Sequence, residues 1–240
     1  MKKFLRAALA RQAFQPPVWA MVVNPFYLIR RALFLRIAEI APHMSGKIVD
    51  LGCGSKPFRN LFTSADVYVG IDIETSGHNH IDSHIDIFYD GISIPLEDSS
   101  VDHVVSFETM EHIFNLNDIL GEVYRILRPG GSVVISIPFG WDEHEVPYDF
   151  ARYTTFGIRH LLETKKFQIS DITRTNSFID AVAQLKIMYL YYITRTNIWI
   201  INQLFQVFLL FPLTLLNIFL AKILPNKTSF FSGIIIIAKK

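Results

Sequence analysis

The stretch KIVDLGCGS, residues 47–55, decides the fold of this chain. Its first five residues, Lys47–Leu51, are mostly apolar, as in a buried strand, and Asp50 places a carboxylate near the end of that strand. Gly52 and Gly54 follow, where the chain must turn sharply and a ligand can approach the backbone. The stretch therefore predicts a strand of an α/β sheet that ends in a ligand-binding turn.

Outward from this strand, short apolar runs alternate with segments of helical periodicity, a pattern typical of a parallel sheet covered by helices on both faces. We expect further strands at Val67–Ile73, near Ile81–Phe88, at Val101–Phe107, at Ser132–Pro138, near Phe167–Ile172 and at Ser232–Ala238. With 240 residues, the chain is long enough for one such domain and an appendage.

Two helices are expected between these strands. Asn115 or Asn117 can cap the first helix, which ends at Pro129-Gly130-Gly131. The second covers Thr155–Lys166, and four apolar residues should face inward: Phe156, Ile158, Leu161 and Leu162.

The composition is unusually apolar. Half of the residues are hydrophobic, 19% are charged and the mean hydropathy is +0.29, more than a freely soluble enzyme of this size usually carries. A net charge of +1 gives no reason to expect a nucleic-acid partner. The single cysteine, Cys53, excludes an intramolecular disulfide and fits a reducing compartment, and no N-terminal stretch has the features of a secretory signal.

Residues 1–45 form a basic N-terminal segment with interleaved aromatic side chains. No acidic residue occurs before Glu39, whereas seven basic residues do: Lys2, Lys3, Arg6, Arg11, Arg30, Arg31 and Arg36. This composition is typical of an amphipathic cap resting on anionic lipid, and a solvated helical cap over the sheet is an equal alternative.

Residues 185–229 are an apolar insertion between a core of residues 46–184 and a last strand in residues 230–240. The 26 positions between Arg195 and Lys222 carry no charge, a length that could span a bilayer. If the last strand joins the same sheet, however, both ends of the insertion must emerge on one side. We also expect Pro212 to break the helix. These features predict a helix pair that lies in the membrane interface or dips into one leaflet; buried helices in a larger core or a dimer interface are the alternative.

The charges around the glycine turn favour one nucleoside cofactor over another. Asp72 closes the second strand, 22 positions after Asp50, where a carboxylate can accept both hydroxyls of a ribose. Binding of NAD would require a third glycine where this chain has Pro57, and Asp50 would repel a pyrophosphate. The same carboxylate can attract the ammonium of a methionine moiety, which favours S-adenosylmethionine (SAM).

Four stretches resemble class I SAM-dependent methyltransferases, and more narrowly the methyltransferase type 11 group: IVDLGCGSKPF, VGIDIE, DGISIPLEDSSVDHVVSFETMEHI and EVYRILRPGGSVVISIPF. The resemblance covers most of residues 47–139. It implies a Rossmann-like α/β fold with a seven-stranded, mostly parallel sheet, helices on both faces and a reversed last strand.

The resemblance also implies roles for single residues. Asp50, Gly52 and Gly54 would hold the methionyl end of SAM and Asp72 the ribose. Asp90 and Gly91 would contact the adenine, and Glu108 would line the methionine pocket, with Glu111 and His112 beside it. A further stretch, PFGWDEHEVPYDFARYTTFGIRHLL, is similar to a subgroup often found with surface-polysaccharide genes.

The loop after the fifth strand carries the best candidates for the chemistry of transfer. Methyl transfer to a hydroxyl needs a group that removes a proton, and His144 has an ordinary pKa near neutrality. His112 and Glu143 are further catalytic candidates, and an ordinary hydrogen-bonded loop is the alternative for all three. Asp142, His144 and Asp149 include metal-ligand types, but without a spaced histidine pair or a cysteine cluster we predict no metal.

The sequence thus predicts a SAM-dependent methyltransferase with a small-molecule, glycan or lipid-linked acceptor and O-methylation favoured. Its expected location is the cytoplasmic side of a membrane, with peripheral or monotopic attachment. A catalytically inactive, membrane-bound scaffold of the same fold and an NAD-dependent oxidoreductase are the alternatives.

Overall fold

The computed structural model describes residues 12–74 and 84–240. Its contacts divide the chain into two compact units. The core unit comprises Ala38–Thr173 with Gly233–Lys240, and the helical unit comprises the chain up to Ile37 with Arg174–Ser232. Lys2, Lys3, Arg6 and Arg11 of the predicted basic segment lie outside the described residues.

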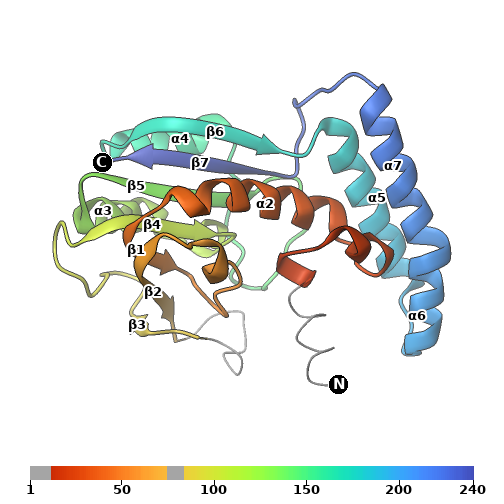
Figure 1. Ribbon diagram of the computed structural model, residues 1–240, viewed down its shortest axis with the longest axis horizontal. Helices are drawn as coiled ribbons and strands as arrows, with labels where there is room; N and C mark the ends of the chain where they lie inside the picture. The colour runs from red at the N-terminus through yellow and green to blue at the C-terminus, as the bar shows by residue number, and fades with distance from the viewer. Residues whose placement is uncertain (1–11, 75–83) are drawn as a thin grey trace. The chain divides into compact units, whose positions relative to one another are not determined.

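A seven-stranded sheet forms the centre of the core unit (Figure 1). Its strands are β1 (Gly46–Leu51), β2 (Ala65–Ile73), β3 (Ile87–Tyr89), β4 (Val101–Phe107), β5 (Leu127–Pro138), β6 (Gln168–Thr175) and β7 (Gly233–Lys239). The strand order is β3-β2-β1-β4-β5-β7-β6. The pairs from β3 to β5 are parallel, and β7 runs antiparallel to β5. The predicted sheet with a reversed last strand is therefore confirmed.

Apolar strands fill the interior of the core unit. Ile48, Val49 and Leu51 of β1 have no exposed surface, because strands in the middle of a parallel sheet are covered on both faces. The helices α3 (Leu116–Ile126) and α4 (Thr155–Thr164) belong to this unit, and α3 contacts both β5 and α4. Short 3₁₀ turns connect strands and helices at Ala41–His43 (η2), Arg59–Leu61 (η3) and Met110–His112 (η5).

Three local expectations need correction. Asn115 precedes α3, but its side chain donates to the Gly91 carbonyl oxygen at 3.1 Å instead of capping the helix. On α4, Ile158 is buried as predicted, whereas Phe156 is 76% exposed because residues two apart on a helix face away from each other. The third strand begins at Ile87, later than expected, and residues 81–83 of that prediction lie outside the described part of the chain.

The helical unit contains η1 (Val18–Val22), α2 (Tyr27–Ile40) as far as Ile37, α5 (Phe178–Thr194), α6 (Trp199–Phe205), the π-helical turn η6 (Gln206–Leu210) and α7 (Phe211–Ile223). A capping box of Ser177 and Asp180 begins α5. The appendage starts earlier than the predicted residue 185, because α5 begins at Phe178.

The expected break at Pro212 is wrong. The chain stays helical from Trp199 to Ile223, a run of 25 residues. Pro212 lies in the first turn of α7, directly after the π-helical turn, and this widened turn accommodates a residue that lacks an N–H. The helix pair is instead formed by α5 and the helix 199–223, which contact each other. Arg195, at the start of the charge-free run, is the C-cap residue of α5.

On the helix 199–223, polar side chains are buried and apolar ones are exposed, the opposite of a helix on the surface of a soluble protein. Three polar side chains are buried, namely Gln206, Thr214 and Asn217, each at most 4% exposed. Asn217 Nδ2 donates to Asp180 Oδ1 of α5 at 2.8 Å. The large apolar side chains point outward, with Trp199 72% and Phe208 74% exposed.

Because β7 is buried, we expect a truncated side chain in this strand to destabilise the protein strongly. Ile236 is fully buried and pairs with Ile135 of β5, so Ile236→Ala should lower the free energy of unfolding by about 2–5 kcal/mol. Urea denaturation followed by circular dichroism measures this change. Ile92→Ala removes the same atoms from a side chain that is 66% exposed, and should cost less than about 0.5 kcal/mol. Equal losses in the two variants would contradict the register of β7.

Candidate active site

The glycine turn after β1 has the shape that a ligand-binding turn requires. Gly52 has φ +73°, and a Cβ atom there would lie 2.1 Å from Thr109 Cγ2, so only glycine fits. Gly54 has φ +46°, and an added Cβ atom would meet nothing within 4 Å. The backbone at Gly54 is therefore open to a ligand, as predicted for the methionyl end of the cofactor.

The two carboxylates predicted to hold the cofactor lie on either side of this turn. Asp50 is 4% exposed, and its Oδ2 accepts a hydrogen bond from Tyr68 Oη at 2.7 Å. Asp72 accepts from the Gly54 amide and from the Ile73 amide, both at 2.9 Å. Each oxygen of Asp72 keeps a second lone pair, which suits the two hydroxyls of a ribose.

Burial changes the acidity of Asp50. Desolvation raises the pKa of its carboxyl to about 7, although the Tyr68 hydrogen bond opposes this rise. Tyr68 was not singled out in the sequence. It lies two positions before Gly70, the residue opposite Asp50 in the parallel register, and only this register shows that its hydroxyl reaches the carboxylate.

A cavity of about 460 Å³ lies beside the end of β2. The described residues that line it are Ile73, Glu74, Phe88, Tyr89, Asp90 and Gly91. Asp90 Oδ1 accepts from the Ile92 and Ser93 amides, both at 2.8 Å, which holds this loop in shape. The predicted adenine residues Asp90 and Gly91 thus form a wall of a cavity whose volume suits a small-molecule ligand.

Glu108, at the end of β4, is held in a strained conformation. Its φ of +52° lies in the left-handed region, which is costly for a residue with a side chain. Its amide donates to Ser136 Oγ at 3.0 Å, and Ser136 Oγ donates to Glu108 Oε1 at 2.7 Å. These contacts orient the carboxylate at the strand end, as expected for a residue that lines the methionine pocket.

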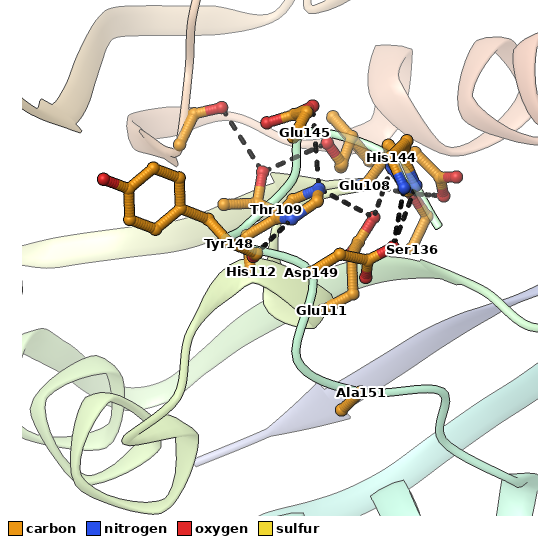
Figure 2. A network of polar contacts seen from close by, with 12 residues as sticks. Glu108, Thr109, Glu111, His112, Ser136, His144, Glu145, Tyr148, Asp149 and Ala151 are labelled. Atoms are coloured by element: carbon orange, nitrogen blue, oxygen red, sulfur yellow. Dashed lines mark hydrogen bonds and ion pairs between the residues drawn. The ribbon is translucent and has the colours of Figure 1, made fainter. Parts of the chain in front are cut away.

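Three side chains from two segments gather close to this carboxylate (Figure 2). Glu111 and His112 come from η5, directly after β4, and His144 comes from the loop after β5. Glu111 Oε1 lies 3.7 Å from His112 Nε2 and 3.9 Å from His144 Nε2. The two imidazole rings meet edge to face with centroids 4.8 Å apart. We call these three residues the Glu-His-His cluster.

Hydrogen bonds to the other ring nitrogens hold both histidines. His112 Nδ1 lies 2.9 Å from the Tyr148 carbonyl oxygen, and His144 Nδ1 lies 3.2 Å from Asp149 Oδ2 and 3.3 Å from the Asp142 carbonyl oxygen. Burial alone would raise the pKa of Asp149, but two hydrogen bonds from Arg152 and its charge hold that pKa at about 2. Asp149 is therefore an anion that orients His144.

Glu111 lies at the centre of the cluster. Its side chain has no exposed surface, and among the described residues neither carboxylate oxygen has a hydrogen-bond partner. Burial raises the pKa of this carboxyl well above its usual range, and the nearby charge of Glu108 raises it further. The sequence signal for this residue is the acid-histidine pair that follows the fourth strand.

The structure therefore brings together some predicted catalytic residues and leaves others apart. His144 and His112 lie in the cluster, whereas Glu143 is an exposed neighbour in the loop. Asp142 lies next to the cluster and holds His144 through its carbonyl oxygen. The spacing of the two histidines in the sequence, 32 positions, does not reveal that they meet. Parallel pairing of β4 with β5 brings their carboxyl ends to one edge.

Comparison with known proteins shows which family the domain that contains this site matches. Residues 49–135, from β1 to β5, match the family model described as a methyltransferase domain. A protein of Mycolicibacterium smegmatis, described as a probable S-adenosylmethionine-dependent methyltransferase, is 30% identical over 55% of this chain and 56% of its own length. Residues 49–135 thus match a methyltransferase domain, and the resemblance to class I SAM-dependent methyltransferases is confirmed. The cofactor predicted from the charges of the turn, SAM, is thereby confirmed.

Other relatives agree with this assignment. The 24-methylenesterol C-methyltransferase 2 of Oryza sativa subsp. japonica is 33% identical over 41% of this chain and 31% of its own length. The structure of a SAM-dependent methyltransferase from Mesorhizobium loti shares the fold, with a TM-score of 0.56, 15% identity, and coverage of 89% of this chain and 100% of that one. The chain spans about half of the length of the relative from Mycolicibacterium smegmatis and less of the sterol methyltransferase.

The acidity of Asp50 predicts pH-dependent cofactor binding. A ligand ammonium prefers the ionised carboxylate, and with a pKa of about 7 that form is lost as the pH falls through neutrality. S-adenosylhomocysteine, which keeps the ammonium, should bind roughly tenfold more weakly at pH 6 than at pH 8. Isothermal titration calorimetry measures both constants. Asp50→Asn should bind weakly at both pH values, and a wild-type affinity that does not change with pH would contradict the role of Asp50.

Proposed function

We propose that this chain is an active SAM-dependent methyltransferase that methylates a hydroxyl group of a small-molecule, glycan or lipid-linked acceptor. One observation carries the proposal. Thr109 packs on Gly52 of the cofactor turn and directly precedes η5, which carries Glu111 and His112. A methyl donor in the turn and an acceptor at the Glu-His-His cluster would therefore be neighbours.

The residues of the turn suit the charges of the cofactor. Asp50 and Glu108 offer carboxylates to the cationic methionyl end, and Gly54 leaves room for it. Asp72 offers its carboxylate to the ribose, and the cavity at Asp90 takes the adenine. SAM supplies a methyl group on a sulfonium, whose carbon–sulfur electron pair stays on sulfur when the methyl group leaves.

The acceptor oxygen has to form a bond to the methyl carbon and to lose its proton. We assign this proton loss to the Glu-His-His cluster, which extends the expectation for His144 and His112 to Glu111. Glu143 receives no role, because it lies exposed outside the cluster. The protein otherwise contributes alignment of the oxygen with the carbon–sulfur bond.

The helical unit supports a membrane-associated acceptor. A soluble protein rarely exposes a continuous apolar surface larger than a few hundred Å². Here the helix 199–223 is long and apolar enough to cross a membrane and turns its apolar side chains outward, while its polar side chains face inward. Lipid is the solvent that fits this arrangement. The relative from Oryza sativa is by name a methyltransferase of a sterol, which is also a lipid.

The connectivity favours attachment to one side of the membrane. The helix pair of α5 and residues 199–223 leaves the sheet after β6 and returns to β7, and these two strands are neighbours. Both ends of the pair therefore lie on the same side, which a single crossing does not allow. We propose monotopic attachment from the cytoplasmic side, in keeping with the single buried cysteine, Cys53.

A transfer assay tests the activity and separates it from the scaffold alternative. The wild-type protein, incubated with SAM labelled in its methyl group and a lipid or polysaccharide extract of its host, should label a product. His144→Ala should keep SAM binding and lose roughly 10²-fold or more of the rate. Asp72→Ala should lose SAM binding, and His160→Ala, an exposed histidine of α4, should resemble the wild type. A folded wild-type protein that binds no SAM would refute the enzyme.

Vesicle flotation tests the attachment. The wild-type protein should float with vesicles that contain anionic lipid and should resist extraction at high pH. Trp199→Glu with Phe208→Glu, which puts two charges on the apolar surface, should release it. Phe156→Glu replaces an equally exposed aromatic residue of the core unit and should not. A wild-type protein that is soluble without detergent, as a monomer or a dimer, would contradict the proposal.

A further inference from the structure

The Glu-His-His cluster turns three potential metal-ligand atoms toward one another. Glu111 Oε1, His112 Nε2 and His144 Nε2 all lie within 4.8 Å of one another. The two Glu111 oxygens and His112 Nε2 are buried and have no hydrogen-bond partner among the described residues. A buried carboxylate in this state is unfavourable unless a proton or a cation neutralises it.

The hydrogen bonds of the imidazoles leave both Nε2 atoms as lone-pair donors. The Tyr148 carbonyl oxygen can only accept, so His112 Nδ1 carries the proton. Asp149 and the Asp142 carbonyl oxygen also act as acceptors, so His144 Nδ1 carries the proton as well. Arg152 Nη2, a donor, lies farther from this nitrogen, at 3.5 Å. Histidines that bind metals in proteins show this pattern, with the second nitrogen donating to a carbonyl or a carboxylate.

The three ligand atoms, all within 4.8 Å of one another, must move somewhat closer to hold one ion. Ligand atoms at about 2.0–2.2 Å from one metal ion lie roughly 3.0–3.5 Å from each other. The two distances from Glu111 Oε1, 3.7 and 3.9 Å, exceed this by less than 1 Å. Figure 2 shows the carboxylate of Glu111 and the two rings turned toward one another. Glu145 Oε1, 3.6 Å from His112 Nε2, is an oxygen close enough to become a fourth ligand.

We propose that Glu111, His112 and His144 bind one divalent transition-metal ion at the carboxyl edge of the sheet. Two imidazole nitrogens and one carboxylate oxygen suit Zn²⁺, Mn²⁺ or Fe²⁺, whereas Mg²⁺ and Ca²⁺ prefer sites made of oxygen. Three ligands from the protein leave positions for water or for an acceptor oxygen.

The role of the ion rests on the proposed function. An acceptor hydroxyl bound to the cation loses its proton to water more readily, and the resulting oxygen forms the bond to the methyl carbon. The ion would also fix the position of this oxygen beside the cofactor turn. The cluster would then promote proton loss through the cation, with both histidines as ligands and not as free bases.

Metal binding itself is the test, because it requires neither SAM nor an acceptor. The full chain without an affinity tag is stripped with a chelator, reloaded with Zn²⁺ or Mn²⁺ and analysed for metal per chain. One equivalent is expected, and Mg²⁺ should not compete at equal concentration. His112→Ala and His144→Ala should each weaken binding at least tenfold. His160→Ala, which removes an exposed histidine, should keep the wild-type affinity.

A second variant tests the site even if the alanine substitutions disturb the fold. Glu111→Gln preserves the shape and removes the buried charge, so the metal-free variant should melt no lower than the metal-free wild type. Added Zn²⁺ should raise the Tm of the wild type and of Glu163→Gln, an exposed control on α4, but not that of Glu111→Gln. Wild-type protein without stoichiometric metal, or equal binding by the cluster variants, overturns the site.

The outcomes for the two proposals can be told apart in the same samples. Binding of SAM and methyl transfer without bound metal would overturn the metal site and leave the methyltransferase intact. Bound metal without SAM binding would overturn the proposed function and leave the site. Transfer that stops on chelation and returns with Mn²⁺ or Zn²⁺ supports both.

Discussion

Parallel pairing of β1 with β4, and of β4 with β5, brings the carboxyl ends of three strands to one edge of the sheet. The residues just beyond these ends supply the glycine turn, Glu108 and the Glu-His-His cluster. Because each strand is buried, its register cannot slip without exposing apolar side chains. The positions of the polar groups therefore follow from the packing of the apolar ones, and the site inherits the rigidity of the sheet.

The edge also contains the backbone conformations that are costly for residues with side chains. Glu108 and Glu145 both have φ near +50°, in a region that glycine usually occupies. Strain of this kind costs of order 1–3 kcal/mol per residue and persists only where the surrounding contacts impose it. Ser136 imposes it on Glu108 through three hydrogen bonds from β5. The chain thus gives up some stability to keep carboxylates beside the cofactor turn.

Local features of the sequence were enough to predict most of the strands, the glycine turn and the cofactor. Each depends on residues that are near one another in the chain, as Asp50, Gly52 and Gly54 are. Two kinds of feature were missed. The contact of His112 with His144 depends on strand pairing between distant segments. The exposure of Phe156 depends on which face of α4 is covered, and the helical conformation at Pro212 depends on the π-helical turn before it. Charge and periodicity alone do not carry that information.

The place of β7 in the sheet has a consequence for synthesis on the ribosome. Residues 233–239 lie between β5 and β6 in the sheet, yet they are translated after both, about a hundred residues after the segment of β5 with which they pair. Until they emerge, β5 and β6 have no strand between them. The helix of residues 199–223 leaves the ribosome before them. The two neighbours of β7 therefore keep unpaired edges until the whole helical segment between β6 and β7 has been made, so the core sheet closes only after that segment.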